Sequence, residues 1–409
     1  MILGDGKSGF IFDEWRAMTR RWGTFNGWLV ANLGRRTSSG RVLPELDGLR
    51  FISIMMVVIY HFNLKFQEIV GASEIDWVAQ LADTGGFGVR IFFVISGFIL
   101  ALPFAAHYLK QGRKVRLGSY FWRRVTRLEP PYIISMTLIL IAWIIFEHAT
   151  LGELFPHYAV GLFYLHNLGY GTMNPVNGVA WTLEVEIQFY LLVPLLMTVF
   201  SIRSRPLRLF VIVAIALCSV ALQTFFIDVD SIWSRTLVAH LQFFLLGLLL
   251  ADIYLVSWNS NPKTHLFWDV LWLISWPLLL LVLEKKIAVD LVTPFLVLLL
   301  FLAAFRGPIT RKALRQATIF TIGGMCYSIY LLHVQIIHVI APFAAEISPG
   351  SSALQFVLQL ALVTPLVILG SAIFFVLIER PCMVKDWPQR LWTHLAQARF
   401  NGVARIRRL

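Results

Sequence analysis

Long apolar runs recur along most of this chain, and they restrict its possible folds more than any other feature of the sequence. A helix needs about 20 mostly apolar residues to cross the hydrocarbon core of a bilayer, where its backbone polar groups must bond internally. About ten segments of the 409-residue chain meet this requirement. We therefore expect an all-α integral membrane protein with about ten transmembrane helices.

The composition agrees with this reading, because 58% of the residues are hydrophobic and only 14% are charged. A soluble domain of this size needs more charge to stay dissolved. The expected transmembrane segments are 44–66, 88–108, 131–146, 183–200, 209–226, 237–255, 267–283, 291–305, 319–341 and 353–378.

The charge distribution orients these helices. The formal net charge is +12, and the Lys and Arg residues fall mainly in alternate loops and in the segment after residue 380. Such loops face the cytoplasm and its anionic lipids. We therefore expect both termini on the cytoplasmic side, and the basic residues indicate membrane lipid rather than nucleic acid as their partner.

Residues 154–170 do not fit the pattern of spans. This stretch is moderately apolar but contains Pro156, His166 and Asn167. If it crossed the membrane, the basic segment 203–208 would lie outside, against the charge rule. We expect a re-entrant or interfacial segment, because irregular backbone survives at membrane depth only against protein or a watery cavity. This segment is thus a candidate wall of a binding site.

The remaining organisation is simple. We expect a cytoplasmic amphipathic segment at residues 1–40, one membrane domain at residues 41–381 and a basic cytoplasmic tail at residues 382–409. The three cysteines, Cys218, Cys326 and Cys382, show neither a disulfide framework nor the spacing of a metal site.

The first expected helix carries ionisable side chains at membrane depth. Arg50 and His61 are eleven residues apart, which is about three helical turns, so they share a face and lie about 16 Å apart along the axis. Asp47 lies on roughly the same face. Ionisable groups at such depth usually face a polar cavity. For Arg50, pairing with Asp47 or extension to the headgroups is the alternative.

A basic loop follows the second expected helix. It contains Lys114 and Arg116, and then Arg124 and Arg127, which would share a helix face. Guanidinium groups present forked donors that suit phosphate oxygens. The loop is therefore either a phosphate-binding mouth or a topology signal alone.

The fourth expected helix begins with Trp181 and carries two carboxylates. Glu186 and Tyr190 are one turn apart and share a face, whereas Glu184 points elsewhere. A carboxylate here could bond an imidazole and fix its tautomer. A buried structural pair is the alternative.

Taken in order, these motifs resemble acyltransferase family 3 of membrane-bound acyltransferases, over about residues 41–381. The resemblance rests on Arg50 and His61 with ten residues between them, and on the Phe-Phe-Val-x-Ser-Gly-Phe stretch that contains Ser96. It rests equally on four further motifs. They are Arg124-x-x-Arg127 before Pro130, the Trp-Thr-Leu-x-x-Glu-x-x-Phe-Tyr block at 181–190, Tyr-x-x-Tyr-Leu-x-His ending at His333, and Glu-Arg-Pro at 379–381.

The resemblance implies transfer of an acyl group, usually acetyl, from cytoplasmic acyl-CoA to a hydroxyl of a glycan, lipid-linked saccharide or similar acceptor. Acetyl-CoA or succinyl-CoA would be a co-substrate, with no tightly bound cofactor and no metal. The expected location is the bacterial inner membrane, with glycan-assembly proteins as further partners. Some relatives carry a fused hydrolase-like domain. We expect this chain to lack one, and to finish the transfer itself or pass the acyl group to a separate protein.

We expect His61 to act as general base on the acceptor hydroxyl, or to carry the acyl group itself. Glu186 or Asp47 would orient it, and Arg50 would hold the donor. The expected contacts to the CoA phosphates are Arg124, Arg127, Arg116 and Lys114, and the other expected pocket residues are Trp181, Tyr190, Ser96, His333 and Asn167. The competing function is a transporter or exporter of an acylated saccharide, which intramembrane ionisable groups also suit.

Overall fold

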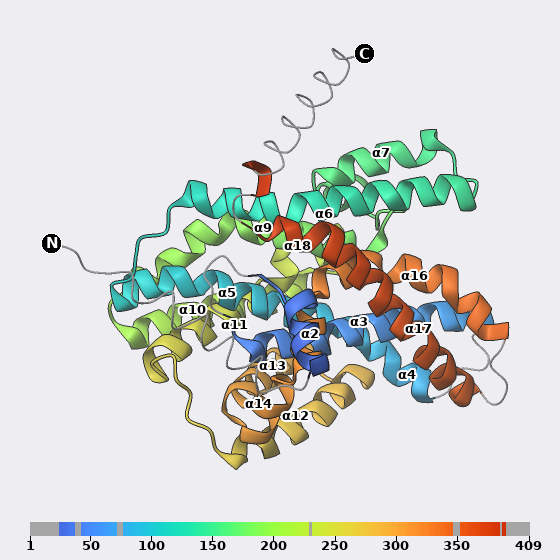
Figure 1. Cartoon of the computed structure of the whole chain (residues 1–409). Helices are drawn as coiled ribbons and strands as arrows, with labels where there is room; N and C mark the ends of the chain where they lie inside the picture. The colour runs from blue at the N-terminus through green and yellow to red at the C-terminus, as the bar shows by residue number, and fades with distance from the viewer. Residues whose placement is uncertain are drawn as a thin grey trace, which may run out of the picture.

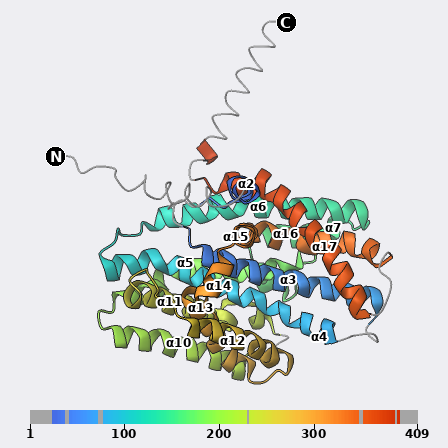
Figure 2. The same cartoon turned by 60° about the horizontal axis from the view of Figure 1, so that its bottom comes forward.

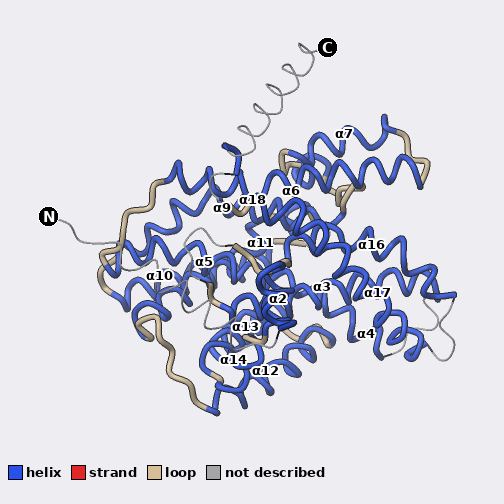
Figure 3. The backbone as a smooth tube through the Cα atoms, viewed as in Figure 1, coloured by secondary structure: helices blue, strands red, loops and turns tan. Residues whose placement is uncertain are grey.

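The computed structural model describes residues 24–36, 42–71, 77–228, 231–346, 352–384 and 387–389. These residues form helices and loops without strands (Figure 3), and ten helical stretches among them are long and apolar enough to cross a membrane. This confirms the expected fold. The principal helices of these stretches are α3 (Pro44–Val70), α5 (Gly88–Lys110), α6 (Leu117–Phe146), α9 (Trp181–Leu196), α10 (Arg205–Phe226), α11 (Leu237–Asp252), α12 (Leu266–Glu284), α13 (Val289–Arg306), α16 (Cys326–Glu346) and α17 (Ser352–Phe374).

Shorter elements connect or extend these helices. They are α2 (Thr24–Leu33), α4 (Trp77–Asp83), η2 (Thr84–Phe87), α7 (Leu151–Leu162), α8 (His166–Tyr170), η3 (Gly178–Ala180), η4 (Met197–Ser201), η5 (Ile232–Arg235), η6 (Ile253–Ser257), α14 (Pro308–Leu314), α15 (Ala317–Gly324), η7 (Phe375–Glu379) and α18 (Arg380–Cys382).

Helix α3 lies in the middle of the bundle and packs against α5, α15 and α16 (Figure 1). Helices α6 and α7 lie at one edge, whereas α10 and α12 lie at the opposite edge (Figure 2). The helix that carries Asp47, Arg50 and His61 is therefore packed against several other helices. Most of the expected segments at 1–40 and 382–409 lies outside the described residues.

Helices α5 and α11 touch backbone to backbone. A Cβ atom on Gly97 would lie 2.2 Å from the carbonyl oxygen of Phe244, and one on Gly247 would lie 2.3 Å from the amide nitrogen of Phe98. Only glycine fits at such a crossing, since small residues let membrane helices approach closely. The crossing thus fixes α5 against α11.

The expected third helix begins too late. The sequence predicts a segment that starts at Pro131, but α6 starts at Leu117 and contains both Pro130 and Pro131. Neighbouring helices in a membrane bundle let a chain tolerate proline inside a helix. Arg124 and Arg127 consequently lie on this helix and not in a loop.

The expected ninth helix is broken into α15 and α16. The break follows Gly323, where a Cβ atom would lie 1.7 Å from the carbonyl oxygen of Asp47. The chain therefore passes in backbone contact with α3 before α16 begins. This contact brings the start of α16 beside the polar residues of α3.

The stretch around residues 154–170 enters the bundle and returns. Helix α7 has 12 residues, too few to span, and it packs along α6. At its inner end the Tyr132 hydroxyl donates to the carbonyl oxygen of Gly161, over 2.8 Å. The chain then comes back to the outer end of α6, where the Trp143 indole donates to Val176 over 3.0 Å. Along α6, the chain therefore runs inward and returns, as expected for the re-entrant alternative that the charges of the loops predicted.

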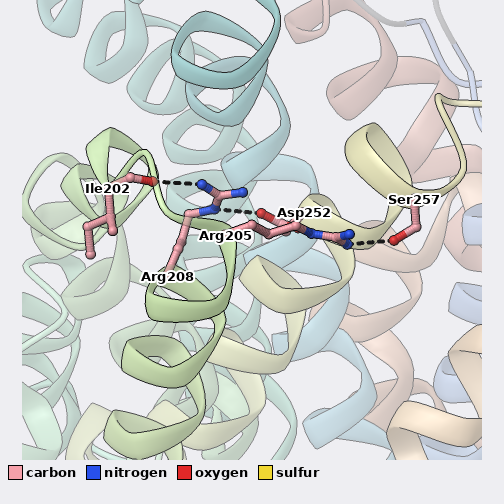
Figure 4. Close-up of polar contacts among 5 residues, drawn as sticks. All are labelled: Ile202, Arg205, Arg208, Asp252 and Ser257. Atoms are coloured by element: carbon pink, nitrogen blue, oxygen red, sulfur yellow. Dashed lines mark hydrogen bonds and ion pairs between the residues drawn. The ribbon is translucent and has the colours of Figure 1, made fainter.

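A buried carboxylate ties α10 to α11 near their cytoplasmic ends (Figure 4). Asp252 is fully buried and accepts from Arg205 Nε over 3.0 Å and from Arg208 Nε over 2.6 Å. Arg208 also donates to the carbonyl oxygen of Ile202, and Arg205 to Ser257. Arg205 and Arg208 therefore hold α10 against α11, in addition to their role as topology signals.

Candidate active site

Two cavities lie one behind the other along α3. The inner cavity lies between the cytoplasmic halves of the helices and is lined by residues that include Arg50, Arg127 and Glu186. The outer cavity opens toward the other side and is lined by residues that include His61 and Trp181. Arg50 and His61 thus line different cavities, although they share one face of α3.

The inner cavity is rich in guanidinium groups. Four arginines line it, together with two carboxylates. They are Arg35, Arg50, Arg124 and Arg127, with Glu186 and Glu379. The Nε atoms of Arg35 and Arg127 are buried and form no hydrogen bond within the described part of the chain. Buried charged donors without a partner are costly, so the cavity suits an anionic ligand.

Helix α6 presents the pair that the sequence singled out. Arg124 and Arg127 are one turn apart, and both line the inner cavity. The Arg124 guanidinium lies 5.3 Å from the ring centroid of Tyr190 and 5.9 Å from that of Tyr120. Cation–π contacts with these two rings stabilise the Arg124 guanidinium beside the cavity, where its forked donors suit an anionic ligand.

Arg50 is held by Asp47. It donates a hydrogen bond to the Asp47 carboxylate, which also lies 3.5 Å from Arg35 Nη2. Asp47 is almost completely buried and occupied by these two cations. The prediction that Asp47 orients His61 was therefore wrong, whereas pairing of Asp47 with Arg50, the stated alternative, is present.

Glu186 also faces the inner cavity instead of His61. Its Oε1 accepts from the Ser96 hydroxyl over 2.6 Å, and the Tyr190 hydroxyl donates to it as well. Glu184, which points the other way, accepts from the backbone N–H of Asn167 over 2.9 Å. The shared face of Glu186 and Tyr190 is confirmed, but orientation of His61 by Glu186 was wrong.

The partner of His61 is His333, on α16. The Nδ1 atom of His333 lies 3.0 Å and 2.8 Å from the carbonyl oxygens of Ile329 and Tyr330, so it carries the hydrogen and Nε2 is an acceptor. That Nε2 lies 3.1 Å from Nδ1 of His61, which is also 2.9 Å from the Val57 carbonyl oxygen.

This pattern assigns the tautomer of His61. Both neighbours of its Nδ1 are acceptors, so Nδ1 carries the hydrogen and the lone pair of the neutral ring lies on Nε2. A ring nitrogen with a free lone pair, on a side chain that lines a cavity, can accept a proton from a bound hydroxyl.

A thin partition separates the two cavities. Val89 and Tyr330 line both of them. The Tyr330 hydroxyl lies 2.6 Å from that of Thr182 and donates to the carbonyl oxygen of Val179 over 3.0 Å. The side chain between the cavities is thus anchored at the start of α9.

Only some of the other expected site residues line the two cavities. Lys114 and Arg116 line a separate hollow between α5 and α6, away from Arg124 and Arg127, so the four do not form one cluster. Asn167 lines neither cavity, since it is buried beside Glu184. Trp181 lines the outer cavity, and Ser96 and Tyr190 line the inner one, as expected for pocket residues.

Two charged residues of the inner cavity were not among the expected site residues. Arg35 comes from the segment before α3, where the sequence reads only as amphipathic. Glu379 is brought inward by the π-helical turn η7, just before Pro381, and accepts from the Ser328 hydroxyl over 2.5 Å. The Glu-Arg-Pro motif was the one available signal for Glu379.

Comparisons with known proteins identify the family of this chain. A family model described as an acyltransferase domain matches residues 43–376. O-acetyltransferase OatA of Staphylococcus aureus is 30% identical over 233 residues, which are 53% of this chain and 35% of that protein. The Putative O-acetyltransferase SACOL0978 of the same species is 27% identical over 230 residues, 52% of this chain and 35% of that protein.

This chain thus matches about a third of the length of these curated relatives. No solved structure matches. The family model, in contrast, spans most of the chain, from just before α3 to the end of α17. The chain therefore belongs to acyltransferase family 3.

Proposed function

We propose that this protein is a membrane-bound O-acyltransferase of the bacterial inner membrane. It takes an acyl group from cytoplasmic acyl-CoA held in the inner cavity and transfers it to a hydroxyl of a glycan or lipid-linked saccharide in the outer cavity. Family membership and the printed names of the relatives support O-acyl transfer. The observation that carries the rest is the lone pair of His61, on a cavity that adjoins the arginine-lined one.

The donor fits the inner cavity by charge. Arg124 and Arg127 present guanidinium groups at the cytoplasmic end, where the phosphates of CoA enter. The apolar wall, which includes Phe92, Ile95 and Ile99, suits the pantetheine arm. The thioester then meets the acceptor hydroxyl at Val89 and Tyr330.

The reaction follows from the assigned tautomer. His61 Nε2 takes the hydroxyl proton as the acceptor oxygen attacks the thioester carbonyl, and the carbon–sulfur bond breaks. The proton then passes to the departing CoA sulfur, so an ester and free CoA thiol are formed. Nδ1 stays bonded to Val57 and His333, which stabilises the imidazolium between the two steps.

The alternative path uses the same nitrogen as nucleophile. His61 Nε2 would attack the thioester, release CoA and hold the acyl group as an acyl-imidazole until the hydroxyl displaces it. Incubation with radiolabelled acetyl-CoA separates the two paths. Protein-bound label that disappears in His61→Ala would establish the acyl-imidazole, and its absence during turnover favours direct base catalysis.

The test of the function is release of CoA thiol by purified protein from acetyl-CoA and succinyl-CoA, with mass spectrometry of envelope glycans to identify the acceptor. We expect cells without the protein to lose one acyl mass increment from a glycan. Thermal stabilisation by acyl-CoA and not by free saccharide separates the enzyme from an exporter. Stabilisation by saccharide alone would refute the proposal.

A further inference from the structure

The segment that precedes α3 is docked on the cytoplasmic end of the bundle. Helix α2 packs against α15, and Val30 is buried with Ala317 and Phe320. Arg380 donates to the carbonyl oxygen of Ala31 over 2.6 Å, so the start of α18 also holds α2. These contacts fix the position of the residues that directly follow α2.

Arg35 is the first of these residues to reach the inner cavity. Its side chain packs beside Gly324, where an added Cβ atom would lie 3.3 Å from the Arg35 Cβ. One end of its guanidinium faces Asp47, 3.5 Å away, while its Nε is buried without a hydrogen bond inside the described structure. Among the described residues, Arg35 thus keeps a charged donor beside the cavity that forms no hydrogen bond.

Charge counting indicates what this donor binds. Asp47 is shared between Arg35 and Arg50, and Glu379 is bonded by Ser328. Burial lowers the pKa of Arg35 to about 10, so the group is still a cation at neutral pH. A buried cation that shares its carboxylate with a second cation stabilises a bound anion, and phosphate suits the guanidinium geometry.

We propose that Arg35 binds a phosphate group of the acyl-CoA, and that the segment before α3 is part of the donor site. This inference rests on the proposed function for the identity of the donor. Arg35 lies outside the residues that the family model matches, 43–376, so family membership does not assign it. Phospholipid headgroups carry the same chemical group, and the experiment distinguishes the two sources.

The chain provides a matched control. Arg36 is the next residue, carries the same charge and is exposed, whereas Arg35 is largely buried. Arg35→Gln and Arg36→Gln therefore change the net charge and the length of the side chain equally. Arg35→Lys keeps the charge but removes the paired N–H donors of the guanidinium group.

The experiment is calorimetric titration of full-length protein in lipid nanodiscs, with CoA and with pantetheine, which lacks the nucleotide phosphates. We expect Arg35→Gln to raise the Kd for CoA about tenfold and to leave that for pantetheine unchanged. Arg36→Gln should change neither by more than about twofold, and Arg35→Lys should fall between wild type and Arg35→Gln.

Each other outcome is informative. Equal CoA affinities of Arg35→Gln and Arg36→Gln overturn the inference and leave the proposed function standing, whereas wild-type protein that binds no CoA removes the proposed function. A Kd raised equally for CoA and pantetheine indicates a structural role and overturns the phosphate contact. Loss of co-purified phospholipid phosphate from Arg35→Gln, with unchanged CoA affinity, assigns Arg35 to lipid.

Discussion

The two cavities differ in the kind of polar group that each presents. The inner one gathers four guanidinium groups and two carboxylates, most of them already bonded within the protein. The outer one offers an imidazole with a free lone pair, aromatic rings such as Trp181 and a rim with Lys285 and Lys286. Fixed charge recognises an anion, whereas a neutral imidazole with an available lone pair accepts a proton.

This difference predicts that binding of the acyl donor and the chemical step can be lost independently. Substitutions in the inner cavity should act on the donor affinity, and substitutions around His61 should act on the rate of the chemical step. The residues of the partition should affect both. The predictions below test this division.

The largest effect is expected for His61→Ala. General base catalysis contributes about 10²- to 10⁴-fold, so kcat should fall by about three orders of magnitude while the Kd for acyl-CoA stays the same. The rate of CoA thiol release and calorimetric titration measure the two quantities.

His338→Ala is the control for this variant, because His338, on α16, lines neither cavity and contacts Glu147 over 3.2 Å. It should retain the wild-type rate. A fully active His61→Ala would exclude the imidazole from the mechanism, and a loss of CoA affinity in the same variant would end the division between the cavities.

Arg124→Gln and Arg127→Gln should each raise the KM for acyl-CoA by about tenfold or more, with kcat changed much less, because each removes one charge-assisted bond to phosphate. Steady-state kinetics with acetyl-CoA measure both constants. Arg123→Gln is the matched control, since this neighbour on α6 is exposed and lines a different hollow. An unchanged KM in both cavity variants would contradict the phosphate contact.

Tyr330→Ala should join the two cavities. A closed site protects reactive groups from water, so we expect hydrolysis of acyl-CoA to rise several-fold relative to transfer. Tyr330→Phe keeps the ring and loses only the bonds to Thr182 and Val179, about 1 kcal/mol, so its ratio should stay near wild type. Product analysis by mass spectrometry gives the ratio, and equal ratios in both variants would show that the ring does not separate water from the thioester.

The smallest effect concerns a second histidine pair, between α7 and α8. His157 Nδ1 lies 2.8 Å from His166 Nε2, and burial lowers the pKa of His166. The unfolded chain therefore binds a proton more readily, so stability should decrease as pH falls below about 6.5. His166→Gln should reduce this loss by a few degrees of Tm at most, about 2 °C, as scanning calorimetry between pH 5 and 8 can measure. The same pH dependence of Tm in wild type and in His166→Gln would contradict this prediction.

Local features of the site could be predicted from the sequence, because helical spacing alone determines them. Arg124 with Arg127, and Glu186 with Tyr190, meet as one-turn neighbours should. The contact between His61 and His333 could not be predicted, since 272 residues separate them and only the packing of α3 against α16 brings them together.

The same limit applies to Arg35 and to the carboxylates. Burial of Arg35 depends on docking of α2 onto α15, which leaves no periodic signal in a segment of ten residues. Asp47 and Glu186 were assigned to His61, but in the structure cations and hydroxyls that lie closer to these carboxylates bind them instead. Element type followed from hydropathy, whereas the choice among polar partners depended on tertiary packing.

The glycine contact between α5 and α11 bears on how such a membrane protein can work. Helix α5 lines both cavities, through Val89 and Ser96, and its Gly97 lies against Phe244 of α11 while Gly247 of α11 lies against Phe98, without a side chain between the backbones. Two helices in such contact cannot rock against each other without a steric clash, so the alternating access of an exporter has no hinge there. In the proposed reaction, the acyl group would pass from one cavity to the other by movement of the Tyr330 side chain, with α5 and α11 held in place.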